Sequence, residues 1–366
     1  MNARATNAGD GTVKPTPPDA PSQARTAPAR AAWLAHPLVR PIGALVALLL
    51  FDAFLVPGFF HLETKDGHLY GAIIDILNRA APLMLAALGM TLVIATRGID
   101  ISVGAVVALS GTVSAMLIGG TMVVNNGTQE YVANTPMALA LAASLGVALL
   151  CGLWNGVLVA GVKLQPIVAT LILMVAGRGL AQLLTDGQIV TVYYKPYFFL
   201  GSGYLAGLPF SLFVVAAVFA VTMLLVKKTA LGLFIQAVGI NPVAARLAGL
   251  RTATLITFVY VFCSACAGMA GMLITSNIKS ADANNAGALL ELDAILAVTL
   301  GGTSLAGGKF SLVGSMIGAL IIQTLTYTIY SLGVPPEVNM VVKSIVVFAV
   351  CISQSSEFRN ILRRSA

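Results

Sequence analysis

The feature that most constrains this chain is a series of long apolar blocks that contain no charged residue. Residues 138–162 form one such block, and residues 205–226 form another. The hydrocarbon core of a bilayer is about 30 Å thick and is crossed by roughly 20 helical residues, so each block is long enough to span it. Buried helices of soluble proteins are usually shorter and would not recur along a whole chain. We therefore expect a membrane protein.

Composition extends this expectation to the rest of the chain. Of the 366 residues, 58% are hydrophobic and only 10% are charged, whereas a soluble domain carries about 25% charged residues. We predict an all-α integral membrane protein with about ten transmembrane helices. The expected spans lie near residues 42–60, 80–96, 103–124, 137–162, 167–184, 208–226, 255–275, 289–305, 312–332 and 338–353.

The two ends of the chain differ from this central part. Residues 1–40 are rich in Ala, Pro, Thr and Arg and have almost no large apolar side chains. They cannot bury a core, so we expect a disordered cytosolic tail. We assign residues 41–355 to the transmembrane domain and residues 356–366 to a basic cytosolic tail.

Lysine and arginine in short loops predict the orientation, because such residues are enriched on the cytosolic side. Lys227, Lys228, Arg246 and Arg251 cluster between the sixth and seventh expected spans. An even number of spans places this loop and both termini in the cytosol. The net charge of +7 is therefore a topology signal. It does not indicate nucleic-acid binding, since no soluble domain is expected to carry a basic face.

The most informative polar segment is the loop at residues 229–251, TALGLFIQAVGINPVAARLAGLR. It predicts a short amphipathic helix, a break, and a second helix with Asn241 as N-cap and proline at its first position. Two rigid helices held out from the membrane suit the docking of a cytosolic partner, whereas a merely solvated loop needs neither. The candidates for this coupling role are Gly239, Asn241, Ala245, Arg246 and Gly249.

This loop also carries a resemblance to a known family. Its AVGINPVAARLAG pattern, together with RGIDISVG at residues 97–104 and ELDAILAVTLGGTSLAGG at residues 291–308, resembles the ribose-type sugar permeases of ABC importers. The resemblance covers residues 75–350. Four further segments are similar to the galactofuranose branch of this family: DILNRAAP from residue 75, LILMVAGRGLAQLLTDGQIVT from residue 171, ADANNAG from residue 281 and PPEVNMVVK from residue 335.

The resemblance implies a multi-pass permease subunit of the bacterial inner (plasma) membrane that translocates a monosaccharide. It implies no ATPase site and no cofactor in this chain, because a separate cytosolic sugar-import ATPase would bind ATP and dock on the 229–251 loop. A periplasmic sugar-binding protein would deliver the sugar. A second permease subunit, related or identical, would complete the path, and the galactofuranose branch favours a related one.

The sequence agrees with the expected absence of an ATPase site. It contains no G-x-x-x-x-G-K-[ST] loop, which is the motif that cradles nucleotide phosphates. The glycine-rich stretch at residues 301–308 lacks the required spacing. We interpret it as a tight turn at the membrane surface, where helices approach closely.

Polar residues inside the spans are candidates for the translocation path. A charge at the bilayer centre costs about 2.5–3.5 kcal/mol on insertion scales, so it should face protein or water. A neutral sugar needs amide or hydroxyl partners and an aromatic ring to stack on. The candidates are Trp154, Asn155, Gln182, Asp293 and Gln323. Each has a structural alternative; Asp293, for example, can simply cap a helix.

Two other classes of protein stay open at this point. An ion-coupled secondary sugar transporter usually holds acidic or histidine relays within its spans. Here His36, His61 and His68 all lie outside the spans. A membrane enzyme acting on lipid-linked sugar would need paired carboxylates, a Cys–His pair or a metal cluster at one surface, and the sequence indicates none.

Two further questions stay open. Cys263 and Cys266 form a C-x-x-C in an apolar span; we interpret them as packing residues, with a disulfide or a metal as the alternative. The sequence also leaves the sugar undecided between galactofuranose, ribose, arabinose, xylose and galactose.

Overall fold

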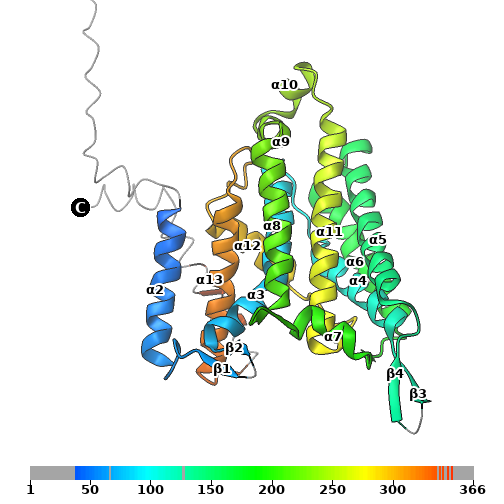
Figure 1. The fold of residues 1–366 in the computed structure, drawn as a ribbon. Coiled ribbons are helices and arrows are strands. Elements are labelled where there is room, and N and C mark those ends of the chain that lie inside the picture. Colours follow the sequence, from blue (N-terminus) through cyan, green and yellow to red (C-terminus); the bar gives the residue numbers. More distant parts are fainter. Residues whose placement is uncertain are drawn as a thin grey trace, which may run out of the picture. The chain divides into compact units, whose positions relative to one another are not determined.

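The computed structural model describes residues 38–65, 67–125 and 128–335, followed by positions 338, 340, 341, 344, 345 and 348. These residues are mostly helical (Figure 1). The two predicted tails, 1–40 and 356–366, lie outside the described residues except for positions 38–40. Most of the predicted last span, 338–353, lies outside them as well.

The helices follow one another with few extended residues between them. In chain order they are α2 (Val39–Leu55), α3 (Ala72–Ala95), α4 (Val103–Ile118), α5 (Met137–Gly156), the π-helical turn η1 (Val157–Gly161), α6 (Pro166–Leu184), α7 (Lys195–Ser202), α8 (Phe210–Lys228), α9 (Leu231–Ile240), α10 (Pro242–Leu247), α11 (Thr252–Ile278), α12 (Leu290–Leu300) and α13 (Leu312–Ser331).

Short antiparallel strand pairs accompany the helices. Within the described residues there are four two-stranded pairs. Strand β1 (Glu63–Lys65) pairs with β2 (His68–Tyr70), β3 (Thr121–Asn125) with β4 (Thr128–Val132), β5 (Val190–Thr191) with β8 (Ser280–Ala281), and β6 (Tyr204–Leu205) with β7 (Leu208–Pro209). These strands were not predicted from the sequence. They are too short and too polar to stand out beside the long apolar helices.

In the part of the chain that the structure describes, six helices are long and apolar enough to cross a membrane: α3, α5 with η1, α6, α8, α11 and α13. Helix α2 has 17 residues, α4 has 16 and α12 has 11, so each of these three is shorter than any of the six. The expected total of about ten transmembrane helices thus stays a prediction. Six candidate spans are established.

Among the six candidate spans, the relation between hydropathy and burial is the reverse of that in a soluble protein. In an 18-residue apolar stretch of each helix, 17% of the residues are buried in α8, which is the most apolar span. In α3 and α13, which are the least apolar, 78% and 61% of the residues are buried. In water the most apolar helix would be the most deeply covered. The reversed order is expected where lipid, which is as apolar as leucine, or another subunit surrounds the outer helices.

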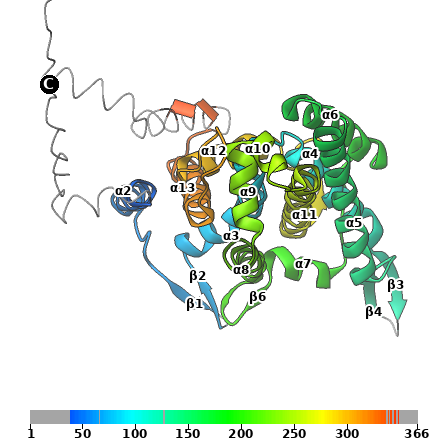
Figure 2. The same ribbon diagram turned by 90° about the horizontal axis from the view of Figure 1, so that it is seen from above.

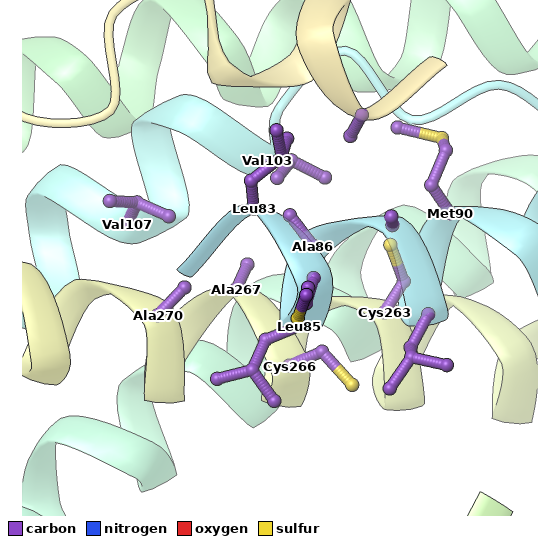
Figure 3. Packing of buried hydrophobic residues seen from close by; sticks show 14 of the residues in the cluster. Leu83, Leu85, Ala86, Met90, Val103, Val107, Cys263, Cys266, Ala267 and Ala270 are labelled. Carbon is purple, nitrogen blue, oxygen red and sulfur yellow. The ribbon is translucent and has the colours of Figure 1, made fainter. Parts of the chain in front are cut away.

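Helices α3, α4 and α11 form the centre of the core (Figure 3). Small residues bring their backbones together, as is usual for helices packed in a membrane. A side chain at Gly89 of α3 would collide with the backbone of Cys263 on α11, and one at Gly271 of α11 would collide with Val107 on α4. Cys263 and Cys266 are buried free thiols at this packing seam.

Helix α3 begins earlier than the sequence analysis predicted. The expected span starts near residue 80, but the helix starts at Ala72 and carries Pro82 in its interior. The polar residues before Pro82 are accommodated because Asp75 and Arg79 form an ion pair one helical turn apart, at 2.8 Å. Proline is tolerated inside helices of membrane proteins because neighbouring groups satisfy the freed backbone.

The packing of the helices defines two ends, which are named after the short helices that lie there. At the α10 end, the last turn of α3 meets the first turn of α13, where Thr91 donates to Ser315 at 2.7 Å. At the α7 end lie the starts of α3 and α8 and the last turns of α6 and α11 (Figure 1). Helix α2 packs beside α13, where Thr328 donates to the buried Asp52 at 2.6 Å.

Candidate functional site

The loop at residues 229–251 forms the two helices that its sequence predicts. Helix α9 ends at Ile240 and α10 begins at Pro242. The Asn241 side chain accepts hydrogen bonds from the backbone nitrogens of Val243 and Ala244, each at 3.0 Å, so it is the N-cap of α10. These two helices, which we call the elbow, lie at one end of the described helices in Figure 1, and the view from above shows them between α13 and α11 (Figure 2).

The elbow is held to the helix bundle through backbone contacts. At Gly239 a side chain would overlap the carbonyl oxygen of Ala95, at the end of α3, and the backbone of Gly308. Gly308 itself donates from its backbone nitrogen to the Ala95 carbonyl at 2.9 Å. Three chain segments therefore meet at Gly239 without intervening side chains, and only glycine fits there.

Arg97 makes a second connection at the same place. Its guanidinium donates to the carbonyl oxygen of Ile240, the last residue of α9, at 2.5 Å. The glycine-rich stretch packs on Arg97 from the other side, because a side chain at Gly307 would collide with it. The glycines at 302, 307 and 308 have positive φ angles of 85°, 82° and 84°, in agreement with the predicted tight turn.

The outer surface of the elbow combines apolar and basic side chains. Leu233, Ile240, Val243 and Leu247 are 68%, 63%, 67% and 85% exposed. Arg246 is also exposed, and its guanidinium lies 3.5 Å from the hydroxyl of Thr252. Among the predicted coupling residues, Gly239 and Ala245 are buried, whereas Asn241, Arg246 and Gly249 are exposed.

The loop between α3 and α4 connects the elbow with α5 and α6. It begins at Arg97 and continues to Asp100, which is fully buried and accepts from the backbone and hydroxyl of Ser102 at 3.0 and 2.6 Å. The amide of Asn155 on α5 donates to the Ser102 hydroxyl at 2.8 Å. On the α6 side, the backbone nitrogen of Ile101 donates to Thr170 at 3.2 Å. Hydrogen bonds thus run from the elbow into two helices.

The structure places the predicted translocation residues on four helices. Asn155 is fully buried in the cluster just described, whereas its neighbour Trp154 is 54% exposed on the outside of α5. Gln182, near the end of α6, donates to Asn284 at 2.8 Å. Asp293 on α12 and Gln323 on α13 are partly buried. Asn155 and Gln182 belong to separate hydrogen-bonded clusters, and the common role of these five residues stays a prediction.

Gln182 belongs to a cluster at the α7 end that includes the ADANNAG segment. Arg178, one turn earlier on α6, donates to the carbonyl oxygens of Ala283, Asn284 and Ala286 at 3.2, 3.3 and 2.7 Å. A single guanidinium therefore fixes the course of this loop. In the sequence, Arg178 interrupts an apolar stretch, but no local pattern indicates that this loop is its partner.

A polar cavity of about 230 Å³ also opens at the α7 end. Its polar lining comes from Asp75, Asn78, Arg79, Ser211 and Asn277 on α3, α8 and α11. In the sequence, Asp75, Asn78 and Arg79 precede an apolar stretch, where such residues usually cap and anchor the start of a helix. Their spacing places them on one face of α3, which was the available signal.

Comparisons with known proteins agree with this architecture. Residues 72–351 match the family described as "Branched-chain amino acid transport system / permease component". The galactofuranose transporter permease protein of Escherichia coli is 49% identical over 320 residues, which cover 87% of this chain and 90% of the relative. No solved structure matches the chain.

Two further relatives are named for other sugars. The fructose import permease protein of Bifidobacterium longum is 36% identical over 335 residues, which are 90% of each chain. The ribose import permease protein of Escherichia coli is 35% identical over 320 residues, 86% of this chain and 92% of the relative. These matches decide against the alternative of an ion-coupled secondary transporter. The chain belongs to the family of transport-system permease components.

Proposed function

We propose that this chain is the membrane-spanning subunit of an ATP-driven importer for a monosaccharide. The observation that carries the proposal is the elbow, which projects an apolar and basic surface while its backbone is fixed to α3 and to the 301–308 turn. A partner that pushes on this surface moves the helices behind it. The chain itself makes no covalent chemistry, and ATP is bound and hydrolysed by the partner.

The elbow is the docking element for the cytosolic ATPase. The exposed side chains of Leu233, Val243 and Leu247 offer apolar anchors, and the exposed Arg246 offers a charge at the rim. Buried apolar anchors with a polar rim are the usual anatomy of a specific protein interface. The basic residues at the α10 end support a cytosolic location for this end and for both termini.

The α3–α4 loop transmits the movement of the elbow. A shift of Ile240 acts on Arg97 through their hydrogen bond, and the same short loop holds Asn155 of α5 and Thr170 of α6 through Ser102 and Ile101. Close-packed contacts of this kind switch between discrete arrangements because they do not deform continuously. Alternating access then follows from tilting α5 and α6 when the ATPase subunits close.

The α7 end faces the periplasm and receives the sugar from a binding protein. The strongly exposed apolar faces of α5, α6 and α8 are covered by lipid and by a second permease subunit. One such subunit does not enclose a path by itself. The second subunit is a related permease or a second copy of this chain.

The cargo is a neutral monosaccharide, with galactofuranose favoured. The relatives are named for galactofuranose, fructose and ribose, and the one named for galactofuranose is 49% identical, against 36% and 35% for the other two. The family description names branched-chain amino acids. The three relatives match 86–90% of this chain and are all named for sugars, so a sugar is the better supported choice.

A reconstitution experiment tests this function. The chain, its ATPase, its binding protein and any second permease are placed in vesicles, and sugar uptake is measured with ATP and with an uncoupler. We expect uptake that requires ATP and survives the uncoupler. Uptake by the permease alone, driven by an ion gradient and without the ATPase, would refute the proposal.

The docking assignment has its own test in the same vesicles. Arg246→Glu reverses a charge on the elbow, and Lys163→Glu reverses one in the exposed loop between η1 and α6, at the same end. We expect only Arg246→Glu to abolish sugar-stimulated ATP hydrolysis while membrane insertion is preserved. Normal stimulation in that variant would contradict docking at the elbow.

A further inference from the structure

The polar cavity at the α7 end lies between elements that are far apart in the sequence. Asp75, Asn78, Arg79 and Pro82 contribute from α3, Gly201 from α7, and Ser211 from α8. The remaining lining residues, Leu273, Ile274, Asn277 and Ile278, belong to the last turns of α11. One wall is thus polar and hydrogen-bonding, and the other is largely aliphatic. A binding site for a small polar molecule combines both kinds of surface.

The polar groups of the cavity are fixed by contacts with one another. Arg79 donates from Nε to both carboxylate oxygens of Asp75, at 3.0 and 2.8 Å. Ser211 donates to the side-chain oxygen of Asn78. The Asn277 amide donates to the backbone carbonyl of Gly201 at 3.3 Å. Side chains fixed in this way present their remaining donors and acceptors in defined directions.

A substantial hydrogen-bonding capacity is left over. Among the residues that the structure describes, the Asn78 amide nitrogen, the terminal nitrogens of Arg79 and the Asn277 side-chain oxygen have no protein hydrogen-bond partner. Together they provide several donors and one acceptor around a single cavity. The hydroxyl groups of a sugar both donate and accept, so they complement this mixture.

The charge of the cavity narrows the class of ligand. Asp75 and Arg79 neutralise each other at 2.8 Å, so the lining has no net charge. A charged ligand would be attracted by one of these groups and repelled by the other. A neutral polyhydroxyl compound avoids this conflict and gains charge-assisted hydrogen bonds from both groups.

An aromatic cluster lies close to the cavity. His68 stacks on Tyr204 with ring centroids 4.6 Å apart, and Tyr70 lies 5.4 Å from the same ring. Tyr204 is near enough to Asp75 to sense its charge: burial first, and then the proximity of Tyr70 and Asp75, raises the pKa of its phenol. Aromatic rings beside directional polar groups are suited to a sugar ring, whose faces are apolar and whose edge is polar.

We propose that this cavity binds a neutral monosaccharide and is the first site that the sugar occupies in the permease. Asn78, Arg79 and Asn277 bind its hydroxyl groups, and the aliphatic wall at Leu273 and Ile274 contacts its C–H face. This inference rests on the proposed function and specifies where, at the proposed periplasmic end, that function begins.

Labelling of an introduced cysteine tests the site in the assembled transporter. Ile278→Cys places a thiol in the cavity lining without removing a proposed sugar-binding group, and a membrane-impermeant thiol reagent reports its accessibility. D-galactose, D-ribose and D-fructose are the probes, at increasing concentrations, with and without ATP. We expect at least one of them to slow labelling several-fold with saturation.

The control is Lys65→Cys, at an exposed position on β1 at the same end but outside the cavity lining. Its labelling should be unaffected by sugar. The unchanged protein gives the background from its own thiols. Equal labelling of Ile278→Cys with and without each sugar, in both nucleotide states, would overturn the site.

Transport kinetics provide the second readout. Asn78→Ala should raise the sugar concentration for half-maximal uptake several-fold and change the ratio of rates between two sugars, whereas Glu63→Gln on β1 should change neither. An unchanged sugar preference in Asn78→Ala would also overturn the inference. If the unchanged protein shows no ATP-driven sugar uptake, the proposed function fails, and this outcome is distinct from failure of the cavity alone.

Discussion

The two ends of this molecule are built in different ways. At the α10 end, backbone meets backbone where Gly239 packs on the Ala95 carbonyl and on Gly308, and the Arg97 side chain binds the Ile240 carbonyl beside this contact. At the α7 end, side chains meet around a cavity, and the connections there are short strand pairs and loops. The first arrangement leaves little room for adjustment. The second presents many adjustable hydrogen-bonding groups.

This difference matches two different tasks. A contact that passes on a mechanical displacement needs stiffness, which close-packed backbone supplies because protein interiors transmit strain. A contact that receives a soluble ligand needs donors and acceptors that water can reach before the ligand arrives. Substitutions at the two ends should therefore fail in different ways. Those at the α10 end should uncouple hydrolysis from transport, and those at the α7 end should change affinity or loop order.

The largest effect is expected at Gly239. In Gly239→Val the new side chain would overlap Ala95 and Gly308, so the elbow has to move away from α3. We expect sugar-stimulated ATP hydrolysis to fall to background while the chain still reaches the membrane. Gly146→Val on α5 is the matched control, because nothing lies within 4 Å of a Cβ atom added there. Full stimulation in Gly239→Val would remove the basis of the comparison.

Arg97 should give the next largest effect. Arg97→Ala removes the donor to Ile240 and keeps the positive φ angle of 64° occupied by a non-glycine residue, so the backbone strain is unchanged. A hydrogen bond from a charged donor contributes about 1.5–3 kcal/mol, and we expect roughly a tenfold or greater loss of uptake per ATP hydrolysed. Arg251→Ala, at an exposed position of the same end, should leave this ratio unchanged.

A moderate effect is expected from the cap of α10. Asn241→Ala removes the acceptor for the backbone nitrogens of Val243 and Ala244, which costs about 1 kcal/mol of helix stability. We expect a loss of about fivefold in the affinity of the ATPase for the permease, measured by titration of the purified partners. Asn241→Asp keeps the cap and should retain most of the affinity. Equal affinity in Asn241→Ala would show that α10 does not need its cap for docking.

The smallest effect concerns pH at the α7 end. The Asn285 side chain above all, and then the Asn285 and Asn284 backbone nitrogens, donate to Asp282 and hold the pKa of its carboxyl below the usual range. These bonds are therefore fully present above about pH 4 and are lost as the pH falls through the lowered pKa. Hydrogen exchange of residues 282–287 should be equally slow at pH 7 and pH 5 after correction for the intrinsic rate.

Hydrogen exchange of residues 282–287 should become faster below about pH 4, as Asp282 takes up a proton. Asp282→Asn provides the control, because it cannot titrate and its exchange should lack this acid dependence. Loosening of the unchanged loop already between pH 7 and pH 5 would contradict the assignment.

Local patterns predicted several of these features. The cap at Asn241, the proline that follows it and the tight turn at residues 301–308 were predicted because each depends on a few neighbouring residues. Long apolar blocks located α5, α6, α8 and α11 to within a few residues. In each case the information lies within one segment of the chain.

Contacts between distant segments could not be predicted in the same way. Ser102 and Asn155 are 53 residues apart, and Arg178 and Ala286 are 108 apart. The apolar blocks look alike, so a single sequence does not indicate which helices are neighbours. Asn155 and Trp154 were both predicted to line the path; the structure buries the first and exposes the second, a difference that no local pattern indicated. The cavity at the α7 end was missed for the same reason.

The reliance on backbone contacts at Gly239 and Gly308 has a consequence for evolution and engineering. The exposed side chains of the proposed docking surface, such as Leu233, Val243 and Leu247, take no part in these contacts, so they are free to diverge. Related permeases with the same helix packing can thereby come to bind different ATPase subunits. Exchanging only these surface residues between two relatives should change which ATPase subunit each permease binds, while the transported sugar stays the same.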